Sequence, residues 1–115
     1  MKKLDELRLK EHEKKAVIEA SKLLREKFPV ESVILFGSKA RGDDDPESDI
    51  DLLLLTTRPI SWRERKAIID SLFDIELSYD VVISILDTPL AAWSEGIFTL
   101  FPIYEEIQNQ GAQAA

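Results

Sequence analysis

The stretch from Val33 to Leu55, VILFGSKARGDDDPESDIDLLLL, holds two short apolar runs separated by a polar, acidic loop. The first run ends at Gly37-Ser38, and the second follows Asp49-Ile50-Asp51. Apolar runs of this length, bounded by turn residues and rich in branched side chains, are typical of buried β-strands. The stretch therefore predicts two neighbouring strands joined by one loop.

Two carboxylates lie at the start of the second predicted strand. Side chains two residues apart in a strand point to the same face, so we expect Asp49 and Asp51 on one face and Ile50 and Leu52 in the core. Adjacent carboxylates repel each other and are costly to desolvate, and a bound cation removes that cost. Because Mg²⁺ prefers carboxylate oxygens, the pair is a candidate metal site.

The turn at the end of the first predicted strand is suited to a phosphate group. Gly37 has no Cβ, so the backbone can turn sharply there and a ligand can approach closely. Ser38 offers a hydroxyl group and can cap a short helical turn, whose free N–H groups attract anions. A phosphate site and a metal site at adjacent strand ends together outline a site for a nucleoside triphosphate.

Gly37-Ser38, ten further residues and then Asp49-x-Asp51 resemble the signature of the DNA polymerase beta-like nucleotidyltransferase superfamily. The surrounding GSKARG and SDIDLLLL are similar to its smallest members, the minimal nucleotidyltransferase (MNT) domains. The resemblance covers roughly residues 17–107. It implies an α/β fold, with a small mixed β-sheet flanked by helices, and transfer of a nucleotide from a nucleoside triphosphate.

The resemblance also implies roles for individual residues. Two magnesium ions would be held by the carboxylates and would bridge them to the triphosphate of ATP. The family has a third carboxylate on a later strand, and Asp80 matches it. The implied catalytic and metal-binding residues are Asp49, Asp51 and Asp80, and Gly37 and Ser38 would hold the β- and γ-phosphates. Arg41, with Lys39 the nearest cation in the sequence, is the third candidate nucleotide-binding residue.

Minimal domains of this kind are usually paired with a HEPN toxin. The resemblance therefore implies an antitoxin that transfers AMP from ATP to a tyrosine of a HEPN-type partner protein. Two alternatives stay open. The chain could bind a nucleotide and neutralise its partner by contact alone, or it could transfer the nucleotide to a small molecule.

Composition limits the other classes of function. The 115 residues carry a net charge of −7 and contain no cysteine, which excludes disulfides and cysteine-type zinc sites. The last basic residue is Lys66, and eight acidic residues follow it, so a nucleic-acid backbone is an unfavourable partner. The single histidine, His12, leaves no Ser-His-Asp triad. No apolar run is long enough to span a bilayer and no signal peptide is evident, so we expect a cytoplasmic protein, with a homo-oligomer left open.

Hydrophobic periodicity predicts the remaining elements of a single domain, 1–115. We expect a helix over residues 4–28, and a second helix that starts at a Ser61–Glu64 capping box and reaches about Phe73. The inward side chains of the second helix are expected to be Trp62, Ile69, Leu72 and Phe73. A third strand is expected over 76–86, with helices after Thr88-Pro89 and over 101–109. We expect the ends, 1–15 and 110–115, to be loosely ordered.

Overall fold

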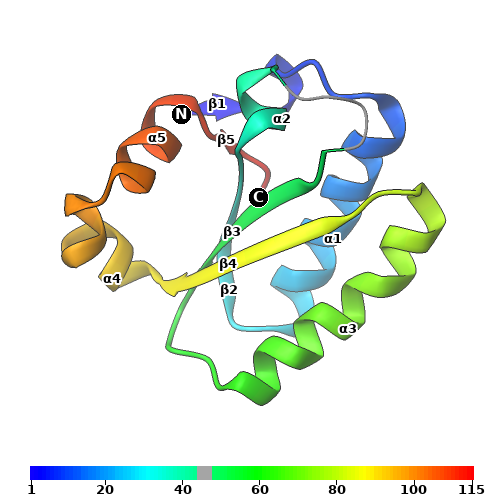
Figure 1. Cartoon of the computed structure of the whole chain (residues 1–115). Coiled ribbons are helices and arrows are strands. Elements are labelled where there is room, and N and C mark those ends of the chain that lie inside the picture. The colour runs from blue at the N-terminus through cyan, green and yellow to red at the C-terminus, as the bar shows by residue number, and fades with distance from the viewer. Residues whose placement is uncertain (44–47) are drawn as a thin grey trace.

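The computed structural model describes residues 1–43 and 48–115 and contains one five-stranded mixed sheet with the order β1-β5-β2-β3-β4 (Figure 1). The long central strands β2 and β3 are antiparallel, and β3 and β4 are parallel. The strands are β1 (Lys2–Lys3), β2 (Val30–Phe36), β3 (Ile50–Thr56), β4 (Ile83–Pro89) and β5 (Ala112–Gln113). The helices are η1 (Leu4–Glu6), α1 (Glu11–Lys27), α2 (Ser38–Arg41), α3 (Trp62–Tyr79), α4 (Leu90–Glu95), η2 (Ile97–Leu100) and α5 (Pro102–Gln110). The predicted α/β class with a mixed sheet is confirmed.

Helices cover both faces of the sheet. Helices α1 and α3 lie side by side on one face, whereas α4, η2 and α5 lie on the other (Figure 1). The alternation along β3 explains why both faces are apolar: Leu52 and Leu54 pack under α1 and α3, and Leu53 and Leu55 pack with Trp93 and Ile107. The long apolar run of β3 is therefore a strand that is buried on both faces.

The N-terminal segment differs from the predicted helix over 4–28. Helix α1 begins only at Glu11, and the first ten residues contain β1 and η1, with Leu4 buried in the core. Strand β5 lies between β1 and β2, and Ala112 is fully buried. Both ends of the chain therefore take part in the sheet, and loose order over 1–15 and 110–115 stays a prediction.

Helix α3 is longer than predicted, and its buried face is shifted by about one residue from the predicted face. It extends to Tyr79, and its buried side chains are Ile68, Leu72 and Ile75. Three of the four side chains expected inside are instead exposed: Trp62, Ile69 and Phe73. Apolar residues stand next to each other at 68–69 and 72–73, so the sequence pattern fits two helix phases.

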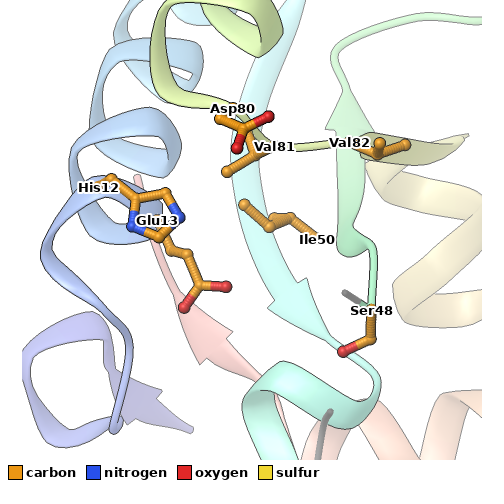
Figure 2. A pocket seen from close by; sticks show the side chains of 7 residues that line it. All are labelled: His12, Glu13, Ser48, Ile50, Asp80, Val81 and Val82. Atoms are coloured by element: carbon orange, nitrogen blue, oxygen red, sulfur yellow. The ribbon is translucent and has the colours of Figure 1, made fainter. Parts of the chain in front are cut away.

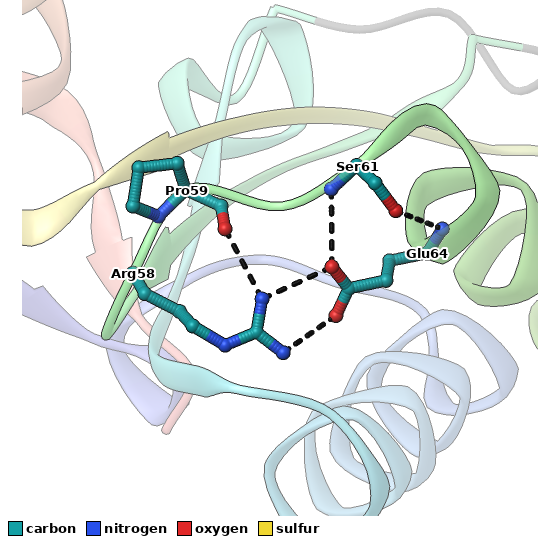
Figure 3. A network of polar contacts seen from close by, with 4 residues as sticks. All are labelled: Arg58, Pro59, Ser61 and Glu64. Atoms are coloured by element: carbon teal, nitrogen blue, oxygen red, sulfur yellow. Dashed lines mark hydrogen bonds and ion pairs between the residues drawn. The ribbon is translucent and has the colours of Figure 1, made fainter.

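The predicted capping box of α3 is present. Glu64 N donates to Ser61 Oγ over 3.1 Å, and Ser61 N donates to Glu64 Oε1 over 3.1 Å. Arg58 donates to both carboxylate oxygens of Glu64 and to the carbonyl oxygen of Pro59 (Figure 3). The side-chain hydrogen bond from Arg58, and then the backbone N–H of Ser61, lower the pKa of Glu64 to about 2. This network fixes the start of α3, with Ser61 as its N-cap.

The strand expected over 76–86 is wrong in its bounds, because α3 runs through residues 76–79 and β4 begins only at Ile83. Two other predictions hold: a helix, α4, follows Thr88-Pro89, and a helix covers 102–110. Residues 44–47, at the predicted acidic loop tip, lie outside the described part of the chain.

Candidate active site

The two aspartates of the central motif lie at the start of β3. Asp51 pairs with Phe36 of β2 and is partly buried, whereas Asp49 directly precedes the strand and is exposed. Ile50 and Leu52, on the opposite face, are at most 1% exposed. The predicted alternation is therefore confirmed, with Asp51 on the face that α4 and α5 cover farther along the strand.

The Gly37-Ser38 turn lies directly against this carboxylate. Gly37 has φ 77° and ψ −158°, a conformation that is essentially restricted to glycine. A Cβ at Gly37 would overlap the Oδ2 atom of Asp51. Ser38 begins α2, and the N–H groups of Ala40 and Arg41 are bonded to the carbonyl oxygen of Gly37. The absent side chain of Gly37 thus lets the turn and the carboxylate meet.

The electrostatics of the pair disfavour two free charges. Burial raises the pKa of Asp51 above its usual range, and the nearby charge of Asp49 raises it further. The positive charge of Arg41 acts in the opposite direction and lowers the pKa of Asp51, but it does not cancel the other two effects. A cation near both carboxylates would remove this unfavourable interaction.

Ser84 is a further residue of the candidate site, and no motif in the sequence pointed to it. It lies on β4 in register with Asp51, and its hydroxyl group donates to Asp49 Oδ2 over 3.1 Å. The available signal was a single hydroxyl residue inside the apolar run VVISIL, at residues 81–86. A lone serine does not indicate a contact with Asp49 until the parallel register of β3 and β4 is known.

Asp80, the expected third carboxylate, is placed differently. It is the C-terminal cap of α3 with φ 54°, three residues before β4, and does not lie at the head of a strand. Asp80 lines a pocket of about 270 Å³ that also contains His12, Glu13, Ser48 and Ile50 (Figure 2). Within residues 1–43 and 48–115, no three His, Cys, Asp or Glu side chains are grouped closely enough to hold a metal ion. The structure thus brings Asp49 and Asp51 together without Asp80.

Arg41, the expected phosphate contact, lies at the end of α2 and is held by acidic side chains. Its Nη1 atom is 2.5 Å from Glu106 Oε1 of α5, and its Nε atom is 3.3 Å from Asp43 Oδ2. Lys39 points away from solvent, and its ammonium group forms a buried ion pair with Glu13 of α1. Arg41 is thus the more accessible of the two cations in this turn.

Comparison with known proteins identifies relatives of this chain. The family described as polymerase beta, nucleotidyltransferase, matches residues 19–96. The protein named "Putative protein adenylyltransferase MJ0141", from Methanocaldococcus jannaschii, is 38% identical over 93 residues, which are 81% of this chain and 85% of the relative. A second protein of that organism, "Putative protein adenylyltransferase MJ0604", is 37% identical over 64% of this chain and 70% of its own length.

Solved structures share the fold. A toxin–antitoxin structure with AMP-PNP superposes with a TM-score of 0.60 at 20% identity, over 89% of this chain and 72% of the other. A complex of a tri-AMPylated Shewanella oneidensis HEPN toxin with its MNT antitoxin gives a TM-score of 0.55 at 21% identity, over 87% and 69% of the two chains. Because the family match spans most of the chain and includes Gly37, Asp49 and Asp51, this chain belongs to the polymerase beta nucleotidyltransferase family.

Proposed function

We propose that this protein transfers AMP from ATP to a protein acceptor of the HEPN type, and so acts as an antitoxin. One observation carries the proposal: the Gly37 turn packs against Asp51, so that the turn expected to bind phosphate and the carboxylate pair form one continuous site. The relatives named as protein adenylyltransferases and the AMPylated HEPN toxin in a similar structure support a protein acceptor. The net charge of −7 is also unfavourable for a nucleic-acid acceptor.

The transfer joins an acceptor oxygen to the α-phosphorus of ATP. The bond between the α- and β-phosphates breaks, pyrophosphate leaves, and the proton of the acceptor hydroxyl group passes to water. Gly37 and Ser38 would bind the β- and γ-phosphates through the first turn of α2, and Arg41 would contact the triphosphate. Charge on the phosphate oxygens grows on both sides of the reacting phosphorus, so the site must supply positive charge there.

The donor set fits magnesium. Asp49 and Asp51 offer carboxylate oxygens on one face, and the Ser84 hydroxyl group holds the Asp49 carboxylate in place. Magnesium bound by this pair would neutralise the charge of the attacking and leaving oxygens. The role expected for Asp80 as a third ligand would require the region before β4 to rearrange, because Asp80 caps α3.

The position of Asp80 also favours a second candidate function. Among residues 1–43 and 48–115 no third carboxylate joins Asp49 and Asp51, and a site of this kind could bind a nucleotide and yet transfer it slowly or not at all. In that case the protein would neutralise its partner by contact. Within the described residues no helix is both long and apolar enough to cross a membrane, and a cytoplasmic location is part of the proposal.

The experiment measures the intact mass of the acceptor. The protein encoded next to this one is incubated with this chain, Mg²⁺ and ATP, and the Asp49→Asn variant is the control. Addition of one or more AMP units, absent in the control, supports the transferase. A stable complex with unchanged mass supports neutralisation by contact. An unchanged mass with no complex overturns both functions and leaves a small-molecule acceptor.

A further inference from the structure

The outer face of α3 carries an apolar stripe. We define the stripe as Trp62, Ile69, Phe73 and Leu77, whose exposed fractions are 66%, 50%, 58% and 67%. Spacings of seven, four and four residues place these side chains on one side of the helix, opposite the buried Ile68, Leu72 and Ile75. The stripe is about 22 Å long at the rise of an α-helix. Large apolar side chains gathered on one exposed face mark an interaction surface.

The charges beside the stripe are divided between the two halves of the helix. Arg63 and Lys66 are exposed in the N-terminal half, and Asp70 and Asp74 are exposed in the C-terminal half. Lys66 and Asp70 already form an ion pair at 2.8 Å within the helix. The docking face therefore has one basic end and one acidic end, joined by apolar side chains.

We propose that this face binds a second copy of the same chain, with the two α3 helices antiparallel. A two-fold axis would place the basic end of one helix against the acidic end of the other, so that Lys66 approaches Asp74 of the second copy, while the two Asp70 side chains, each paired with Lys66 of its own helix, lie near the axis. Ile69 and Phe73 would then pack against each other at the centre. A partner of uniform charge, basic or acidic, would meet repulsion at one end of the stripe.

The proposed dimer leaves the nucleotide site open. Helix α3 packs on the sheet face that buries Ile50 and Leu52, whereas Asp51 points to the opposite face. Because the two surfaces lie on opposite sides of the sheet, loss of the dimer is not expected to change nucleotide binding. Dimerisation can therefore be tested independently of the transferase activity.

The first test measures molecular mass by sedimentation equilibrium over a range of protein concentrations. The wild-type chain is expected to approach twice the monomer mass of 13.1 kDa, and Phe73→Glu is expected to remain a monomer at every concentration. Leu100→Glu is the matched control, because Leu100 is 80% exposed on η2, outside the stripe, and this variant is expected to dimerise normally. Circular dichroism and ATP titration confirm that each variant keeps its fold and its site.

The second test exchanges charges. Lys66→Asp and Asp74→Lys, made singly, are each expected to weaken the dimer at least tenfold, because both symmetry-related ends of the interface then carry like charges. The double variant is expected to restore the wild-type dissociation constant. A wild-type chain that stays monomeric at the highest concentration overturns the proposal. A double variant that dimerises no better than the single variants overturns the antiparallel pairing.

Discussion

Arg41 of α2 and Glu106 of α5 form an ion pair with 2.5 Å between Nη1 and Oε1, although 65 residues separate them in the chain. The pair connects the Gly37-Ser38 turn to the C-terminal helix. The guanidinium group proposed to contact a triphosphate thus already bonds to a carboxylate in the nucleotide-free protein. A phosphate that binds Arg41 must compete with Glu106.

This competition predicts that Glu106→Gln binds ATP more tightly than the wild type. Removing one carboxylate takes away a competitor for Arg41 and a source of repulsion for the triphosphate. An exposed ion pair contributes up to ~1 kcal/mol. Loss of this competing pair is therefore expected to lower the dissociation constant for ATP by about two- to fivefold. Isothermal titration calorimetry with ATP and Mg²⁺ measures it.

Glu105→Gln is the matched control, because Glu105 is exposed and its replacement by Gln removes the same charge. We expect it to change ATP binding much less than Glu106→Gln. Equal effects of the two variants would assign the result to net charge and not to the contact with Arg41.

The aspartate pair predicts opposite effects on binding and on stability. Asp51→Asn is expected to abolish magnesium-dependent ATP binding. In the absence of nucleotide its melting temperature should be equal to or higher than that of the wild type, because the variant removes the repulsion from Asp49. A large loss of stability in nucleotide-free Asp51→Asn would point to a structural role instead.

The raised pKa of Asp51 sets the pH dependence of this effect. Because folding favours the protonated carboxyl group, Asp51 contributes stability below its unfolded pKa and loses that contribution as pH rises through the raised, folded pKa. The advantage of Asp51→Asn over the wild type should therefore be largest at neutral pH and shrink toward pH 4. Thermal unfolding of both proteins across this range measures the difference. A stability difference between the two proteins that does not change with pH would contradict a raised pKa of Asp51.

The contact between Gly37 and Asp51 predicts that Gly37→Ala destroys the site. The backbone conformation of Gly37 costs other residues about 1–3 kcal/mol, and the added methyl group must displace the Asp51 carboxylate. We expect a lower free energy of unfolding together with loss of ATP binding. Gly42→Ala separates the two effects, since Gly42 also has positive φ, 82°, but a Cβ there meets nothing within 4 Å. That variant should lose stability and keep ATP binding.

The buried ion pair of Glu13 and Lys39 predicts that replacing one of its members strongly destabilises the protein. Burial alone would raise the pKa of Glu13, but hydrogen bonds from Lys39 and from the backbone N–H of Lys10 outweigh it and lower the pKa. Replacing one member, as in Lys39→Met, leaves a buried charge and is expected to cost about 3–5 kcal/mol of the free energy of unfolding. Urea denaturation at pH 7 measures the loss.

The double variant Glu13→Gln with Lys39→Met is expected to recover most of the stability, because it removes both charges. Asp5→Asn tests whether the loss of any ion pair would destabilise the protein as much as Lys39→Met does. Its partner Lys14 lies at the surface, so this variant should have little effect. A double variant as unstable as Lys39→Met would rule out an isolated buried charge as the cause.

The core of the site could be predicted because its signals are local. Gly37, Asp49 and Asp51 flank two apolar runs, and the two-residue period of a strand fixes which side chains share a face. Asp80 could not be placed, because the segment around Tyr79 fits either the end of a helix or the start of a strand. Ser84 depends on the register between β3 and β4, which no local pattern specifies.

The two short strands at the chain ends also could not be predicted from local sequence patterns. Strands β1 and β5 have two residues each, so neither has a period to detect. Their pairing depends on contacts between residues about a hundred positions apart. The phase of α3 failed for a different reason, since adjacent apolar residues at 68–69 and 72–73 satisfy two helix orientations and only packing against α1 and β4 selects one.

The position of β5 has a consequence for how the chain folds. Residues 112–113 fill the gap between β1 and β2, and the N–H group of Val33 donates to the carbonyl oxygen of Ala115. Until these residues arrive, the backbone of β2 presents an unpaired edge that can recruit other chains. Long-range closure of this kind is slow, so in refolding followed by pulsed hydrogen exchange the amides shared by β2 and β3 should become protected before those of β5. The interval between these events is when the protein is most prone to aggregate.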